Sequence, residues 1–162
     1  MIPIAVLSAA YARNLEIIKM QTKNLSHQDS LIQLPFRSNC LNWVVGHLLA
    51  NRCNIFRLLE AEDLLPGVDL SPYERESEPI QGEGEGVLPL EDLIGYLEET
   101  QIALSQLLKG ETPESLQRPM EYRSGGEKPL AYWLFFLYFH DSYHVGQTEL
   151  LRQAAGTDDK II

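Results

Sequence analysis

Basic residues are scarce in this sequence. Its 162 residues include 13 lysines and arginines against 23 aspartates and glutamates, which gives a formal net charge of −10 at pH 7. Proteins that bind nucleic acids or anionic lipid surfaces need a basic footprint for the contact. We therefore expect neither a nucleic acid nor a membrane as a partner.

Cysteines and long apolar runs are also scarce. Cys40 and Cys53 fall in one segment that is predicted to be a single helix, which places them roughly 20 Å apart, too far to pair there. Reduced thiols and a cytoplasmic location are the expectation. The longest apolar run, residues 130–139, is too short to cross a bilayer. The N-terminus lacks the basic region of a signal peptide.

Apolar residues instead recur at helical spacing. Pro89 and Pro129 suit the first turn of a helix, Gly156 suits a helix end, and Ser38 or Asn39 suits an N-cap. The sequence has no convincing strand pattern, internal repeat or second domain. It predicts a single all-α four-helix-bundle domain over residues 1–162. The expected helices cover residues 4–25, about 39–59, 89–110 and 129–155.

Two connections interrupt the helical pattern. Residues 60–88 contain three prolines, several glycines and many acids, which predicts a long loop between the second and third helices. Such a loop is either a functional rim or a solvated connector. Residues 111–128 form a second polar connection, and His27 lies in a third, where we expect a solvent-exposed side chain.

The fourth helix is apolar or aromatic on nearly every side between Tyr132 and Phe139. A helix of this kind is buried on more than one side. Three thin helices cannot cover such a surface, so we expect a homodimer with an isologous contact. The aromatic residues concerned are Tyr132, Phe135, Tyr138 and Phe139.

Three of the four histidines can meet in one place. His140 and His144 are four residues apart, so their imidazoles share one helix face and can reach one cation. This spacing is common by chance, and His47, in an apolar part of the second helix, could equally be an ordinary core residue. Burying a histidine costs free energy unless its ring nitrogens have partners, and a metal site between facing helices is one explanation for burying all three.

The neighbouring residues fit a pocket around such a site. Trp43 and Asn51 lie one turn to either side of His47, while Phe136 and Gln147 continue the strip of His140 and His144. Three imidazoles without a fourth protein ligand leave a position open for water or a small-molecule substrate. The predicted metal ligands are His47, His140 and His144. The residues predicted either to line the pocket or to support the ligands from behind are Trp43, Asn51, Phe136 and Gln147. No catalytic residue is identified.

These motifs carry a resemblance to a known family. The segment "LNWVVGHLLANR", followed by "FHDSYHVGQTELLRQAAG", resembles the DinB-like (YfiT-like) family of metal-dependent enzymes. The resemblance implies a four-helix bundle, with the family's three metal ligands at His47, His140 and His144 and its terminal motif at Gly146 and Gln147. It covers nearly the whole chain, although only these motifs are discriminating.

The resemblance also implies a range of chemistry. Better understood relatives use a low-molecular-weight thiol, such as mycothiol or bacillithiol, in transfer or isomerisation reactions. A metal that lowers the pKa of the thiol suits this chemistry, because the thiolate is the nucleophile. The expected cofactor is one divalent ion, zinc or nickel, and the expected function is that of a thiol-dependent transferase or a hydrolase.

Two other interpretations stay open at the level of sequence. The segment "HDSYH" is also a variant of the zincin motif, with Asp141 in place of the glutamate base. Its aspartate is one methylene shorter, and a downstream third ligand is hard to find. The second alternative is a non-catalytic, dimeric metal- or ligand-binding module that acts in stress response.

Overall fold

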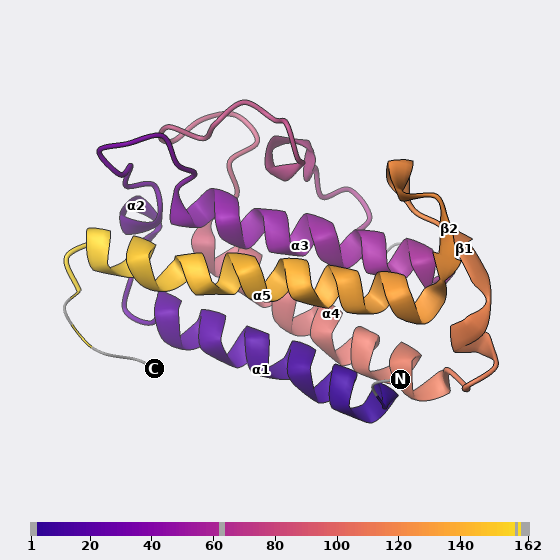
Figure 1. Ribbon diagram of the computed structural model, residues 1–162. Helices are drawn as coiled ribbons and strands as arrows, with labels where there is room; N and C mark the ends of the chain where they lie inside the picture. The colour runs from indigo at the N-terminus through magenta and orange to yellow at the C-terminus, as the bar shows by residue number, and fades with distance from the viewer. Residues whose placement is uncertain (1–2, 62–63, 158, 160–162) are drawn as a thin grey trace.

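Four long helices form a bundle in the computed structural model of the protein (Figure 1). The structure describes residues 3–61, 64–157 and 159. The four long helices confirm the predicted all-α four-helix bundle. The long helices are α1 (Ile4–Thr22), α3 (Leu41–Leu58), α4 (Leu90–Gly110) and α5 (Leu130–Ala154), and the short helix α2 (His27–Ser30) follows α1.

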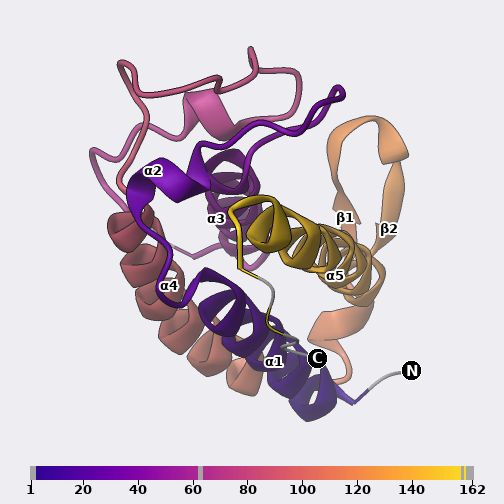
Figure 2. The ribbon, with the colours of Figure 1, turned by 90° about the vertical axis from the view of Figure 1, so that its left-hand side faces the viewer.

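The directions of the helices explain the long connection between α3 and α4. Helix α1 packs against α4 and α5, and α3 packs against the same two helices. Figure 1 shows α1 and α5 running in one direction and α3 and α4 in the other, and Figure 2 shows the bundle from one end. Because α3 and α4 are parallel, residues 59–89 must return along the whole bundle. This crossover loop passes over the outer side of α3.

Helix α3 is the most deeply buried element. Sixteen of its 18 residues are buried, which the bundle alone cannot achieve for one of four helices. The crossover loop covers the remaining side, where Tyr73 of the short helix η1 (Ser71–Tyr73) is fully buried. Helix α5 is less enclosed than its sequence predicts, since Phe135 and Phe139 remain exposed.

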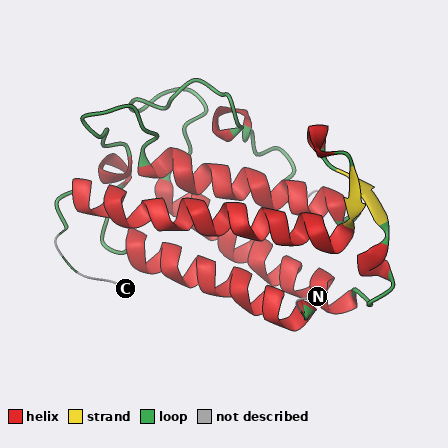
Figure 3. Cartoon of the chain, viewed as in Figure 1, coloured by secondary structure: helices red, strands yellow, loops and turns green. Residues whose placement is uncertain are grey.

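The connection between α4 and α5 contains a small hairpin that the sequence analysis missed. Strands β1 (Pro119–Glu121) and β2 (Glu127–Pro129) pair in antiparallel fashion, with the short helix η3 (Arg123–Gly125) between them. Figure 3 shows these strands in yellow at the end of the bundle where α5 begins. A further short helix, η2 (Ser115–Gln117), precedes the hairpin.

Most predicted helix ends agree with the structure to within a few residues. Gly156 has the positive φ of 87° expected after a helix, and α5 begins directly after Pro129. The N-cap of α3 was predicted wrongly: it is Cys40 rather than Ser38 or Asn39, and no side chain caps the helix. None of the helices in the described residues combines the length and the hydrophobicity that a membrane crossing requires.

Candidate metal centre

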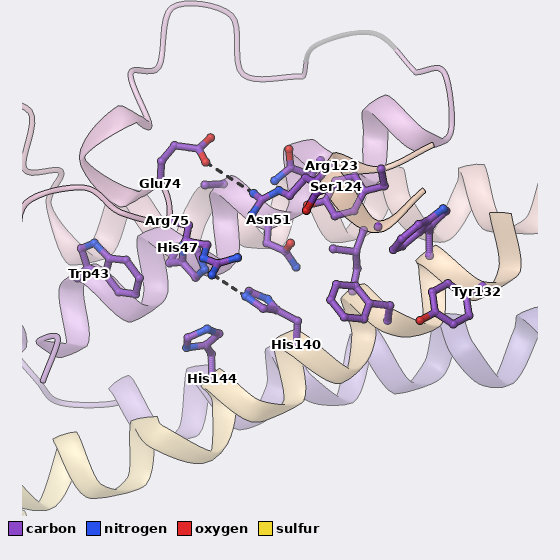
Figure 4. Close-up of a pocket in the computed structure, with 17 residues that line it drawn as sticks. Trp43, His47, Asn51, Glu74, Arg75, Arg123, Ser124, Tyr132, His140 and His144 are labelled. Atoms are coloured by element: carbon purple, nitrogen blue, oxygen red, sulfur yellow. Dashed lines mark hydrogen bonds and ion pairs between the residues drawn. The ribbon is translucent and has the colours of Figure 1, made fainter. Parts of the chain in front are cut away.

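Three histidines meet between α3 and α5. His47 lies near the middle of α3, and His140 and His144 lie one turn apart on α5, which packs against α3. One ring nitrogen from each histidine can be chosen so that all three lie within 4.8 Å of one another. Figure 4 shows the three imidazoles directed toward one another. The structure thus brings together the three residues that the sequence selected.

The backbone of the crossover loop orients His47. Its Nδ1 lies 2.6 Å from the carbonyl oxygen of Tyr73. A carbonyl can only accept a hydrogen bond, so Nδ1 carries the proton and the neutral ring keeps its lone pair on Nε2. Trp43 stacks on the same imidazole, with ring centroids 4.5 Å apart and planes inclined by 11°. These contacts direct Nε2 of His47 toward His140.

Gln147 orients His144 in a similar way. Nδ1 of His144 donates to Oε1 of Gln147 over 2.7 Å, which leaves the lone pair of the neutral ring on Nε2. This contact agrees with the prediction that Gln147 supports the site. His140 differs, because its buried Nδ1 has no hydrogen-bond partner in the part of the chain that the structure describes.

Burial keeps the three imidazoles neutral. It is the main cause that lowers the pKa of His47 and of His144 below the ordinary value. For His140, burial and then the neighbouring His144 and His47 lower the pKa to about 3. Neutral imidazole is the form that binds a metal. The site is therefore in its ligand form at neutral pH.

The donor atoms fit a single divalent ion. Nε2 of His47 and Nε2 of His140 are 3.2 Å apart. Two ligands of one tetrahedral ion lie about 3.3 Å apart when each metal–nitrogen bond is about 2.0–2.1 Å. Neutral imidazole is also a type of ligand that zinc and nickel bind well. The three-histidine cluster is therefore compatible with metal binding.

A cavity of about 480 Å³ opens beside the three histidines. Its volume lies in the range of small-molecule sites. The predicted pocket residues Trp43, Asn51 and Phe136 line it together with the three histidines, whereas Gln147 does not. The wall also includes residues that the sequence analysis did not select, among them Glu74, Arg75, Tyr122, Arg123 and Trp133.

Comparison with known proteins agrees with this arrangement of helices and histidines. The family model for the DinB superfamily matches residues 19–148, most of the chain. The chain belongs to the DinB superfamily. A search of curated proteins gives no significant match.

Beneath the histidines, this DinB superfamily protein contains a buried polar network. Asp141, only 2% exposed, accepts a hydrogen bond from Asn51 over 2.5 Å and lies 3.7 Å from the guanidinium of Arg52. Arg52 in turn donates to Gln101 over 2.8 Å. Burial raises the pKa of Asp141 to about 6, against the opposing effects of Arg52 and Asn51. The network joins α3, α4 and α5 behind the site.

The position of Asp141 argues against the zincin interpretation. Its carboxylate is directed into the core, toward Asn51 and Arg52, and the residue does not line the cavity. A general base must reach the reacting water or substrate. Asp141 instead supports the helices that carry the histidines.

The expectation for His27 was wrong, because its ring is held between two parts of the chain. Its Nε2 donates to the carboxylate of Glu83 over 2.8 Å, and its Nδ1 accepts from the backbone N–H of Leu90 over 3.2 Å. Its side chain is 22% exposed. His27 thus connects the crossover loop to the start of α4, away from the three-histidine cluster.

Sequence reasoning could not find the residues that act through their backbone or through a loop. The carbonyl of Tyr73 is one of them, since any residue type supplies a carbonyl. The one signal was Gly46, directly before His47 in an apolar helix. A Cβ there would overlap the ring of Tyr73, and a glycine inside a helix often marks such a close approach.

Proposed function

We propose that this DinB superfamily protein is a metal-dependent enzyme. In this proposal His47, His140 and His144 bind one divalent ion, zinc or nickel, and a small molecule reacts in the adjoining cavity. One observation carries the proposal: three neutral imidazoles converge at the wall of a cavity of about 480 Å³. Three protein ligands leave coordination positions free for a substrate, as catalytic sites do.

The proposed reaction uses an activated thiol or water. A divalent ion at this site would lower the pKa of a coordinated thiol or water and so supply a nucleophile at neutral pH. The residues of the chain hold the site in place: Tyr73 and Gln147 fix two imidazoles, and Trp43 stacks on His47. Transfer of a low-molecular-weight thiol is the reaction that the family resemblance favours, with hydrolysis as the alternative.

The cavity favours an enzyme over a non-catalytic binding module. A site sealed by Trp43 and Phe136 would have no room for a substrate. Both residues instead line the open space, and the side chain of Phe136 is partly exposed. A purely structural metal site is normally closed by a fourth protein ligand, and the described residues include no such group in the cluster.

The ligand assignment is tested by substitution. His47→Ala, His140→Ala and His144→Ala should each lower zinc affinity at least about a hundredfold, because each removes a ligand. Gln147→Leu should lower it less, about tenfold, since Gln147 only orients His144. His27→Ala is the matched control and should leave zinc affinity unchanged. Competition with a chelator measures all five variants, and unchanged affinity in His140→Ala would refute the site.

Cobalt(II) in place of the native ion tests whether a coordination position is free for a substrate. Addition of a small thiol to the cobalt protein should produce a sulfur-to-cobalt charge-transfer band, because a free coordination position accepts the thiolate. His140→Ala should not produce the band. Its absence in the unaltered protein would support the non-catalytic module. Metal analysis after purification without a nickel column identifies the native ion.

A further inference from the structure

The wall of the cavity beyond the histidines includes five aromatic side chains. Side chains from three separate segments, α3, the hairpin and α5, contribute to it. Flat rings provide a surface on which a planar apolar group can stack at little cost in conformational entropy. The five aromatic side chains are Trp43, Tyr122, Tyr132, Trp133 and Phe136.

The mouth of the cavity carries positive charge, in contrast to the chain as a whole. Arg75, Arg123 and Glu74 are the charged residues on the cavity wall, apart from the histidines, among those that the structure describes. The local balance is thus positive, while the chain has a net charge of −10. Both arginines contribute to the lowered pKa of His140, so their field reaches the metal centre.

The two arginines come from opposite sides of the mouth. Arg75 belongs to the crossover loop and Arg123 to the hairpin, and Figure 4 shows Arg123 near Glu74, above His140 and His144. Arg123 has a φ of +51°, a conformation that is unfavourable for residues other than glycine. Strain of this kind gathers at functional sites. Here it occurs in the turn that places Arg123 at the mouth.

Neither arginine is committed to a strong ion pair. Nη2 of Arg123 is 4.0 Å from Oε2 of Glu74, and Nε of Arg75 is 3.8 Å from Oε1 of Glu76. Arg75 and Glu76 are largely exposed, and Arg123 and Glu74 are nearly half exposed. Solvent-accessible pairs of this length stabilise little. A bound carboxylate could replace them with charge-assisted, bidentate hydrogen bonds.

We propose that the cavity selects a small carboxylate-bearing molecule with a planar apolar body. Its carboxylate pairs with Arg123 and Arg75, its body lies against Trp43 and Phe136, and its reactive end faces the three histidines. This inference deepens the proposed function, because it names the substrate class of the same site. Arg123 and Arg75 are its specificity-determining residues.

The test compares two probes on chelator-treated protein, so that no metal can bind the carboxylate. The probes are 2-naphthoate and its neutral counterpart 2-naphthamide, and calorimetry measures their affinities. We expect naphthoate to bind at least about tenfold more tightly, the effect of a charge-assisted hydrogen bond. Both tryptophans of the chain line the cavity, so binding there should also change the intrinsic fluorescence.

The arginines are tested in the same assay. The double variant Arg75→Gln with Arg123→Gln should lose the preference for naphthoate and bind naphthamide as before. Arg13→Gln, an exposed arginine on α1 that pairs with Glu16, is the matched control and should keep the preference. Circular dichroism checks that each variant is folded. Equal affinity for the two probes, or equal weakening of both in the double variant, would overturn the inference.

The two proposals can fail separately. Probe binding is measured without metal, and metal content is measured without a probe. Loss of the three-histidine site with a retained naphthoate preference would refute the metal-dependent reaction alone. A confirmed metal site with no naphthoate preference would refute the carboxylate specificity alone.

Discussion

At the scale of single residues, burial favours the neutral form of the histidines in the site. His47, His140 and His144 all have lowered pKa values, with burial as the main cause. An ordinary histidine, with a pKa of about 6.5, would still be largely protonated at pH 6 and would have to lose that proton before binding a metal. Because the pKa values of these three residues are lowered, fewer protons have to leave before the metal binds.

This difference predicts how many protons leave when the metal binds. Three ordinary histidines would release about two protons at pH 6. Because burial lowers the pKa values of all three imidazoles, we expect fewer protons to leave than that. Calorimetric zinc titrations in buffers of different ionisation enthalpy give this number, with His27→Ala used to remove the unrelated histidine. Release of two protons or more would show that burial does not act in this way.

Burial also determines how much the ion pair between Asp141 and Arg52 contributes to stability. Both side chains are 3% exposed, and they form an ion pair of 3.7 Å. Removing one member of a buried pair leaves the other charge uncompensated. Asp141→Ala should therefore lower the free energy of unfolding by about 3–5 kcal/mol. Denaturant unfolding measures this change.

The control for Asp141→Ala is an exposed ion pair. Glu16 pairs with Arg13 at 2.9 Å, but both side chains are more than half exposed. Glu16→Ala should cost less than about 1 kcal/mol, because water screens the charges. Similar losses in both variants would mean that the buried network contributes no more than a surface pair.

At the scale of the elements, the helices carry the three histidines, and the loops between the helices add further residues to the site. The four helices could be predicted because apolar residues recur at helical spacing in each of them. His140 and His144 could be paired from their i, i+4 spacing. His47 could be added because one metal site explains three buried histidines, and because the family resemblance implies it. The hairpin could not be predicted, because strands of three residues are too short for an alternating pattern. The roles of Tyr73 and Arg123 depend on where the crossover loop and the hairpin pack, which no local pattern encodes.

The contact between the crossover loop and α3 can be tested at Gly46. A Cβ at this position would overlap the ring of Tyr73. The ring is fully buried, and its hydroxyl donates to Asn42 and accepts from the N–H of Leu88, so it cannot easily retreat. Gly46→Ala should therefore cost about 1–3 kcal/mol of stability, as overpacking does.

Gly46→Ala should also weaken zinc binding, because the carbonyl of the displaced Tyr73 orients His47. The matched control is Gly95→Ala in α4, where a Cβ would meet nothing within 4 Å. Alanine there should stabilise the helix by about 0.5–1 kcal/mol. Thermal unfolding and chelator competition measure both variants. A stable Gly46→Ala protein with full zinc affinity would show that the loop does not position His47.

Considered as a whole, the molecule leaves one face of α5 uncovered. Its exposed apolar residues recur three or four positions apart and form a strip on one side of the helix, which we call the α5 strip. Phe139 is 62% exposed, whereas Tyr138 packs edge-on against Tyr11 and belongs partly to the core. The α5 strip consists of Tyr132, Phe135, Phe139 and Tyr143, with Leu150 farther along.

We propose that a second copy of the chain covers the α5 strip. Helix α5 has 25 residues and is about 37 Å long, and two such helices related by a two-fold axis would bury the same side chains on each copy. A Cβ added at Gly146 would meet nothing within 4 Å, so the two helices could approach closely there. Tyr132 also lines the cavity, which places this contact beside the site.

Sedimentation at micromolar concentration tests the homodimer. The unaltered chain should be a dimer, and Phe139→Glu should be a monomer, because a buried glutamate at the centre of the contact has no partner. Phe139 is exposed in the single chain, so this variant should still fold. Ile102→Glu is the matched control: Ile102 is 64% exposed on α4, which lies across the bundle from α5. That variant should remain dimeric, and an unaltered chain found only as a monomer would contradict the proposal.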